Sequence, residues 1–338
     1  MATKLTGLER TMRFLMGERT DFIPFHPIIM RWAAKYAGVK YRDFCTIPES
    51  KARSMMICAD DFGIDWVTVM SDPWAEASAF GIEVEYPEDN LPLGKTGLFP
   101  DADSTRYLKK YNPLGNPRCS GRIEEIKIFS KKASDKFIVG WIEGPVAEYV
   151  DLRGASNAAV DFLIGQEAVE EAMGVIMESA YDFIELQVKA GAHCIGIGDA
   201  FCSQIGPELY QTYAFERQKK LVDCIHSYGA IAKLHICGDT TSLLEAMIKT
   251  GSDIIDIDHL VKDISSHASI LMKHQVLCGK CDPVTIIENG SEENILEAVY
   301  RDFSDAGGRS IVSAGCEITP GTSIENMRLF RKAAESLN

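Results

Sequence analysis

The stretch that decides the fold reads Ile231-Ala232-Lys233-Leu234-His235-Ile236-Cys237-Gly238-Asp239. Its apolar start is typical of a short buried strand, and the Gly-Asp pair is typical of the turn that ends such a strand. Similar runs lie near residues 24, 66, 139, 195, 255, 277 and 312, and each is followed by a helix. Eight strand-helix units favour a parallel sheet closed into a (β/α)8 TIM barrel over an open doubly wound sheet. No Gly-x-Gly-x-x-Gly opens the first unit, which weakens the dinucleotide-binding alternative.

Two segments lie outside this repeat. Residues 5–17 have a helical pattern and predict an N-terminal helical extension. Residues 81–117 are rich in Pro, Gly, Asn and Asp, which predicts a loop-rich insertion. The first strand, within 21–30, is interrupted by proline and must lie at a sheet end or a barrel mouth. We expect one domain over residues 1–338.

Composition and charge exclude several classes of partner. The chain has 46% apolar and 25% charged residues, as a globular protein does, and a formal net charge of −14. Nucleic acid and anionic membrane surfaces need clustered Lys and Arg, so we expect neither as a partner. No apolar run approaches the roughly 18 to 20 residues that cross a bilayer. We expect a cytoplasmic protein, and a homodimer is compatible with the sequence.

The strand that ends in Gly238-Asp239 carries two metal-ligand side chains. His235 and Cys237 are two residues apart, so they share one face of a strand. Cys316 follows the last strand and is the candidate for a third ligand. Two thiolates and an imidazole suit zinc, and three protein ligands leave one position open, as in catalytic zinc sites. The alternative is that these three side chains only fill the barrel.

The other candidates follow other strands, whose carboxyl ends face the same mouth. Asp199 is either a general acid or substrate-orienting group, or the N-cap of the next helix. Glu143, at the end of the strand near 139, is the second catalytic candidate. Asp72 precedes proline, which is also typical of a plain turn. The candidates for substrate contact at this mouth are His26, Asp72 and His259.

Several segments together carry a family resemblance: 27–36, 71–73, Glu143-Gly144-Pro145 with Asp151-Leu152-Arg153-Gly154, 235–238, and Gly315-Cys316-Glu317-Ile318-Thr319-Pro320. In them the chain resembles the uroporphyrinogen decarboxylase superfamily, and within it the corrinoid-dependent zinc methyltransferases. The decarboxylases hold substrate carboxylates with two arginines; here Arg31 matches one, and Lys35 stands at the other position. Arg31 is therefore a substrate-binding candidate. The decarboxylases also lack the His-x-Cys and distant Cys set, which argues against porphyrinogen decarboxylation.

The resemblance implies zinc held by His235, Cys237 and Cys316, and a corrinoid (cobalamin) carried by a partner protein. The leading expectation is that a methyl group moves from a methoxylated donor, such as an aromatic methyl ether, to Co(I) of that corrinoid protein, as in the methyltransferase of an O-demethylase. The alternative is transfer from a methylcorrinoid to a thiol of the coenzyme M type. A second alternative is a decarboxylase-like protein that only binds a tetrapyrrole.

Overall fold

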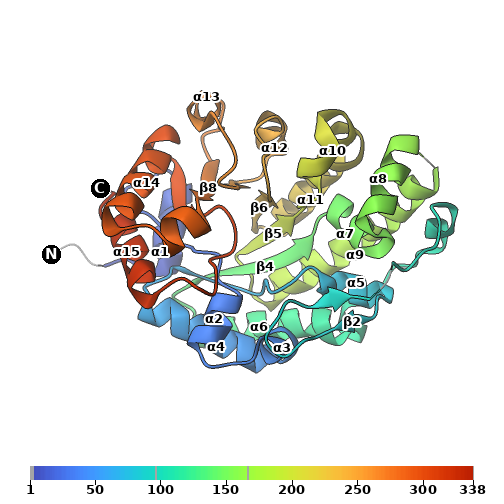
Figure 1. Ribbon diagram of the computed structural model, residues 1–338, viewed down its shortest axis with the longest axis horizontal. Coiled ribbons are helices and arrows are strands. Elements are labelled where there is room, and N and C mark those ends of the chain that lie inside the picture. Colours follow the sequence, from blue (N-terminus) through green and yellow to red (C-terminus); the bar gives the residue numbers. More distant parts are fainter. Residues whose placement is uncertain (1–3, 96, 166, 338) are drawn as a thin grey trace.

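A curled sheet of seven parallel strands forms the centre of the molecule (Figure 1). The computed structural model describes residues 4–95, 97–165 and 167–337. The strands follow one another in the order β1-β4-β5-β6-β7-β8-β9. Their bounds are β1 Trp66–Thr68, β4 Phe137–Glu143, β5 Cys194–Gly198, β6 Ile231–Ile236, β7 Ile254–Ile257, β8 Val276–Cys281 and β9 Ser310–Ala314. All seven lie where the apolar runs predict them.

The first predicted strand takes another form. Only Phe25 makes a β-bridge, to Val312 of β9. The N–H of His26 donates to the Val312 carbonyl at 2.9 Å, and on the other side the N–H of Asp65 donates to the Phe25 carbonyl at 3.0 Å. Pro24 and Pro27 have no N–H to continue the ladder, so the segment does not form a regular strand. It still joins β9 to the start of β1, and the (β/α)8 prediction is confirmed with one irregular member.

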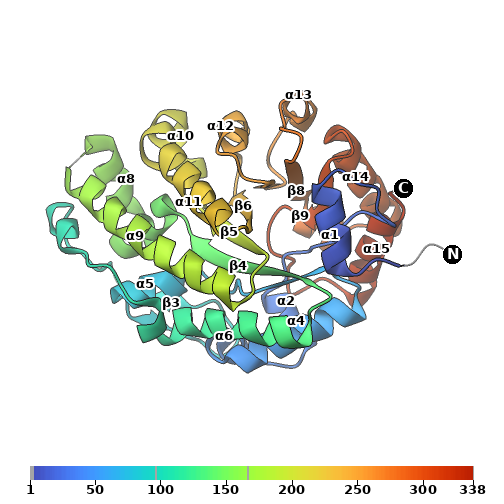
Figure 2. The ribbon, with the colours of Figure 1, turned by 180° about the vertical axis from the view of Figure 1, so that it is seen from behind.

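Helices surround the sheet, and both views place the N-terminal segment beside the C-terminal helices, as closure requires (Figures 1 and 2). Their bounds are α1 Gly7–Leu15, α2 Arg31–Tyr36, α3 Tyr41–Thr46, α4 Pro48–Asp61, α5 Trp74–Phe80, α6 Pro117–Lys132, α7 Pro145–Arg153, α8 Ala155–Ile164, α9 Glu167–Ala190, α10 Cys202–Leu209, α11 Glu216–Ser227, α12 Leu244–Lys249, α13 Ile264–Ala268, α14 Glu292–Asp305 and α15 Ile324–Glu335. In the described ranges, none of these helices has the length and apolar character to cross a membrane.

The two segments outside the repeat have the predicted character. Helix α1 is the N-terminal extension, and its Thr11 accepts a hydrogen bond from the indole of Trp66 in β1 at 2.8 Å. The described residues of the 81–117 insertion, 81–95 and 97–117, form only short pieces before α6 begins at Pro117. These are an antiparallel pair, β2 Val84–Glu85 and β3 Leu93–Gly94, and the 3₁₀ turns η1 Asp103–Tyr107 and η2 Pro113–Gly115.

One buried carboxylate ties the irregular first segment to the barrel. Asp65 is 3% exposed and accepts a hydrogen bond from the Phe25 N–H at 2.8 Å. It also forms a salt bridge with Arg10 of α1 and lies 3.6 Å from a guanidinium nitrogen of Arg331 in α15. One side chain therefore holds the two chain ends and the closing segment together.

We expect Asp65→Ala to lower the free energy of unfolding by about 1–3 kcal/mol, because it leaves the buried Phe25 N–H without its acceptor and removes one of the two carboxylates that pair with Arg10, the other being Asp21. Equilibrium unfolding in guanidinium chloride measures this. The matched control is Asp60→Ala, which removes an exposed carboxylate 3.4 Å from Lys136 and should cost at most about 1 kcal/mol. Equal losses in the two variants would contradict the role of Asp65.

Candidate active site

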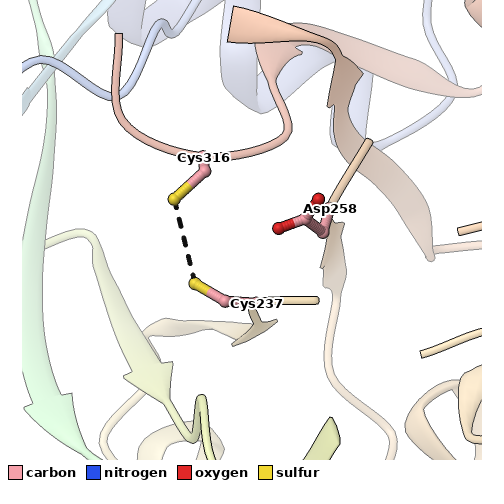
Figure 3. A group of neighbouring side chains, drawn as sticks. All are labelled: Cys237, Asp258 and Cys316. Atoms are coloured by element: carbon pink, nitrogen blue, oxygen red, sulfur yellow. Dashed lines mark hydrogen bonds between the residues drawn. The ribbon is translucent and has the colours of Figure 1, made fainter. Parts of the chain in front are cut away.

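Two sulfur atoms meet at the mouth of the barrel. Cys237 directly follows β6, Cys316 follows β9, and their Sγ atoms lie 3.9 Å apart (Figure 3). A glycine next to each cysteine allows the backbone to take this path. Gly238 has a φ of 91°, and a Cβ on Gly315 would lie 2.2 Å from the backbone nitrogen of His259. The backbone therefore comes close enough to bring the two thiols together, although the strands are not neighbours in the sheet.

His235 completes the group predicted from the sequence. Its Nε2 lies 3.0 Å from Cys237 Sγ, and its Nδ1 lies 3.0 Å from a carboxylate oxygen of Asp256 in β7. Burial alone would raise the pKa of Asp256, but Lys233, 2.5 Å away, and His235 lower it well below its usual value. The Asp256 carboxylate behind the ring favours the orientation in which Nε2 faces the Cys237 sulfur.

Asp258 is a member that the sequence reading missed. The run Asp253, Asp256, Asp258 and His259 has the spacing of no standard metal site and predicts strand edge and loop. In the structure, however, Asp258 has one oxygen within 4.8 Å of both Cys237 Sγ and Cys316 Sγ (Figure 3). Its Oδ2 also accepts a hydrogen bond from the Gly238 N–H at 2.9 Å. Asp258 could have been found from strand pairing. It directly follows β7, which pairs with β6 so that Asp256 lies in register with His235.

This donor set fits a zinc ion. Two thiolates that share a tetrahedral zinc at about 2.3 Å each lie about 3.8 Å apart, and the sulfurs here lie 3.9 Å apart. The two sulfurs share a hydrogen bond in which either can be the donor. The interaction with Cys237 lowers the pKa of Cys316 to about 6, while the interaction with Cys316 and burial raise the pKa of Cys237. Cys316 is thus the thiol that ionises first. A nitrogen and two sulfurs are the ligands that zinc prefers.

A cavity of about 210 Å³ opens beside the sulfurs. Apolar side chains make up much of its wall, and none of its lining residues is Lys or Arg: Ile28, Met30, Met70, Asp72, Pro73, Trp141, Glu143, Gly198, Ala200, His235, Cys237, Cys316 and Glu317. Burial alone would raise the pKa of Asp72, but Arg118, 2.6 Å away, and Arg122 lower it to about 2. Glu143 accepts a hydrogen bond from the Trp141 indole at 2.9 Å, and burial raises its pKa well above the usual value.

Asp199 makes its hydrogen bonds inside the protein and does not line the cavity. Its carboxylate accepts hydrogen bonds from the Ala147 N–H at 2.7 Å and from the Gln218 amide at 2.8 Å. It therefore binds the first turn of α7, not the helix that follows it, so the N-cap alternative names the wrong helix. Burial raises its pKa to about 6. Its neighbours Gly198 and Ala200 line the cavity, but Asp199 does not.

The remaining candidates lie around the cavity rather than in its wall. His26 is buried and stacks on Trp66, and burial lowers its pKa well below the usual value. A ring nitrogen of His259 lies 2.7 Å from a carboxylate oxygen of Asp258, and His259 is not part of the cavity wall. Arg31 is partly exposed and forms a salt bridge with Glu317 at 3.1 Å. Of the four predicted substrate contacts, only Asp72 lines the cavity.

Comparisons with known proteins agree with this geometry. The family model "Uroporphyrinogen decarboxylase (URO-D)" matches residues 6–337. The chain is 30% identical to a methylcobamide:CoM methyltransferase, MtbA, of Methanosarcina acetivorans, over 81% of this chain and 80% of that one. It is 26% identical to a uroporphyrinogen decarboxylase of Prochlorococcus marinus, over 97% and 96%. The solved structure of a methyltransferase from Methanosarcina mazei superposes with a TM-score of 0.87 at 21% identity, over 98% of each chain, which shows the shared fold.

The two sulfurs predict a difference in reactivity. After treatment with a chelator, Cys316 should be alkylated by iodoacetamide at a rate that is half-maximal near pH 6, because the thiolate is the nucleophile. Cys224 is the control, since burial raises its pKa and it should react only at higher pH. Peptide mass spectrometry measures both sites in one sample. The same pH dependence at both would contradict the lowered pKa of Cys316.

Proposed function

We propose, from the premise that the chain belongs to the uroporphyrinogen decarboxylase (URO-D) family, that it is a zinc-dependent methyltransferase acting with a corrinoid protein. The observation that carries the proposal is the convergence of His235, Cys237 and Cys316 at the edge of the cavity. A relative at 30% identity is named as a methylcobamide:CoM methyltransferase, which supports methyl transfer over decarboxylation.

His235, Cys237 and Cys316 would hold the zinc, with Asp258 as the nearest further donor. Bound there, zinc supplies a Lewis acid that stabilises negative charge on a substrate oxygen or sulfur. The chain's own residues do the rest. Asp256 orients the imidazole of His235, and the apolar wall excludes water from the reacting methyl group. Glu143 is the carboxyl group in the cavity wall whose pKa burial raises well above its usual value, so it is the group that we assign to exchange a proton with the substrate.

The leading reaction takes the methyl group from a methoxylated donor. The wall offers Met30, Met70 and Trp141 to an aromatic ring, and a protonated Glu143 to the ether oxygen. Co(I) of the corrinoid supplies the electron pair for the new bond to the methyl carbon. The pair of the broken C–O bond stays on oxygen, which takes up a proton. A neutral aromatic ether also suits a wall without Lys or Arg.

The second reaction runs from methylcorrinoid to a thiol. The name of the Methanosarcina relative favours it, because that protein is described as acting on coenzyme M. Here the thiol loses its proton, and the thiolate takes the methyl group from cobalt. Coenzyme M carries a sulfonate, and two arginines that contact the cavity wall are already paired, Arg31 with Glu317 and Arg118 with Asp72.

Two assays separate these reactions. With 2-methoxyphenol and cobalamin reduced to Co(I), the first predicts the absorption spectrum of methylcobalamin; with methylcobalamin and coenzyme M, the second predicts its loss. Cys316→Ala should abolish the active reaction and lower the zinc-to-protein ratio at least tenfold, because one of the three ligands is gone. Cys224→Ala, a cysteine on the outer helix α11, should change neither.

The proposed function would be refuted if the zinc-loaded protein transferred no methyl group in either direction, both with free cobalamin and with a corrinoid protein. Full zinc retention by Cys316→Ala would refute the ligand set.

A further inference from the structure

A second, smaller cavity lies behind Glu143. It is lined by Glu76, Phe80, Tyr111, Ile142, Glu143, Glu148, Ile176 and Ala180, and its volume of about 10 Å³ is enough for about one water molecule. Glu143 lines this cavity and also the large one beside the sulfurs. One carboxyl group therefore joins the reaction cavity to a buried acidic chamber.

Glu148 is the unexplained member of this chamber. It lies on α7, is 2% exposed, and neither of its carboxyl oxygens has a hydrogen-bond partner among the residues that the structure describes. One oxygen of Asp151, one turn further along the same helix, is also buried without a partner. A buried ionised carboxylate without a partner is strongly disfavoured, whereas a protonated one is tolerated.

The surrounding charges do not balance. Arg122 of α6 is the cation among these groups, and it donates to Glu76 at 2.9 Å and to the Asp72 carbonyl at 2.8 Å. From α9 only the apolar Ile176 and Ala180 face the chamber, and Tyr111 is neutral. Counting Asp72 and its partner Arg118, two guanidinium groups face five carboxyl groups, the others being Glu76, Glu143, Glu148 and Asp151. Among the described residues, the oxygens of this group are not close enough together to form a metal-binding cluster.

We propose that Glu148 and Asp151 are a buried proton store that keeps Glu143 supplied, so that Glu143 exchanges one proton with the substrate in each turnover. This rests on the proposed function. In demethylation, Glu143 gives its proton to the leaving oxygen, Glu148 replaces it through a water molecule in the chamber, and one proton from solvent refills the store in each turnover. In the thiol reaction, the S–H proton passes to Glu143 and on to Glu148. Burial and the neighbouring carboxyl groups raise the pKa of Glu148 well above its usual value and that of Asp151 to about 8.

Glu148→Gln tests the store, because it keeps the shape of the side chain and removes its proton exchange. Infrared spectroscopy of the zinc-loaded protein at pH 8 should show the C=O stretch of protonated carboxyl groups, shifted in D2O, and the variant should lose part of this band. Glu148→Asp should restore it. Glu178→Gln, an exposed change on the α9 helix that covers the chamber, is the matched control and should leave the band intact.

The pH profile of methyl transfer gives a second readout. Once either Glu143 or Glu148 has ionised, its charge opposes ionisation of the other, so the two groups titrate as a pair. Replacing Glu148 with a neutral amide removes this opposition, so the limb of the profile that reports the second ionisation should move to lower pH in Glu148→Gln, in whichever direction the enzyme works. A variant with a lower rate but an unmoved limb has only a structural defect, which would overturn the proposal.

The two readouts also separate this proposal from the proposed function. Absence of methyl transfer with an intact infrared band refutes the function and leaves the protonated chamber standing. An unchanged band in Glu148→Gln overturns the store even if methyl transfer is found. Should that variant fail to fold, a wild-type protein without the band at pH 8 would overturn it equally.

Discussion

The closing of a parallel sheet into a ring is the constraint on which the site depends. Cys237 and Cys316 are 79 residues apart in the chain and come from strands that are not neighbours, yet their sulfurs lie 3.9 Å apart. Only a ring makes the ends of β6 and β9 face each other across one mouth. Closure in turn relies on Phe25, bridged to β9 on one side and bonded to Asp65 on the other.

Much of this was predictable from residue pattern alone. Apolar runs located every regular strand of the large sheet, and the two-residue spacing of His235 and Cys237 placed both on one face. The irregular first strand was less predictable, because two prolines remove ladder hydrogen bonds without preventing a single bridge. Asp258 was missed because the spacing of Asp253, Asp256 and Asp258 with His259 matches no standard metal site. It lies beside the sulfurs because of the register between β6 and β7, which a linear sequence does not display.

The roles of single carboxylates were the hardest to predict. Asp199 and Glu143 both end buried strands, and nothing in the sequence distinguishes them. In the structure, Asp199 accepts a hydrogen bond from the first turn of α7, whereas Glu143 lines the cavity. The difference lies in which backbone N–H groups come near, and that depends on packing between elements far apart in the chain. Glu148 could not be predicted for the same reason, because its carboxyl group loses its contact with water only when packing buries it.

The central claim is that His235, Cys237 and Cys316 hold a zinc ion with one further position for a light atom. Zinc K-edge X-ray absorption of the purified protein tests it most directly. A zinc ion held by His235, Cys237 and Cys316 should show two sulfur ligands at about 2.3 Å and two nitrogen or oxygen ligands at about 2.0–2.1 Å, the values for tetrahedral protein zinc. A shell of only nitrogen and oxygen atoms, or of four sulfurs, would contradict it.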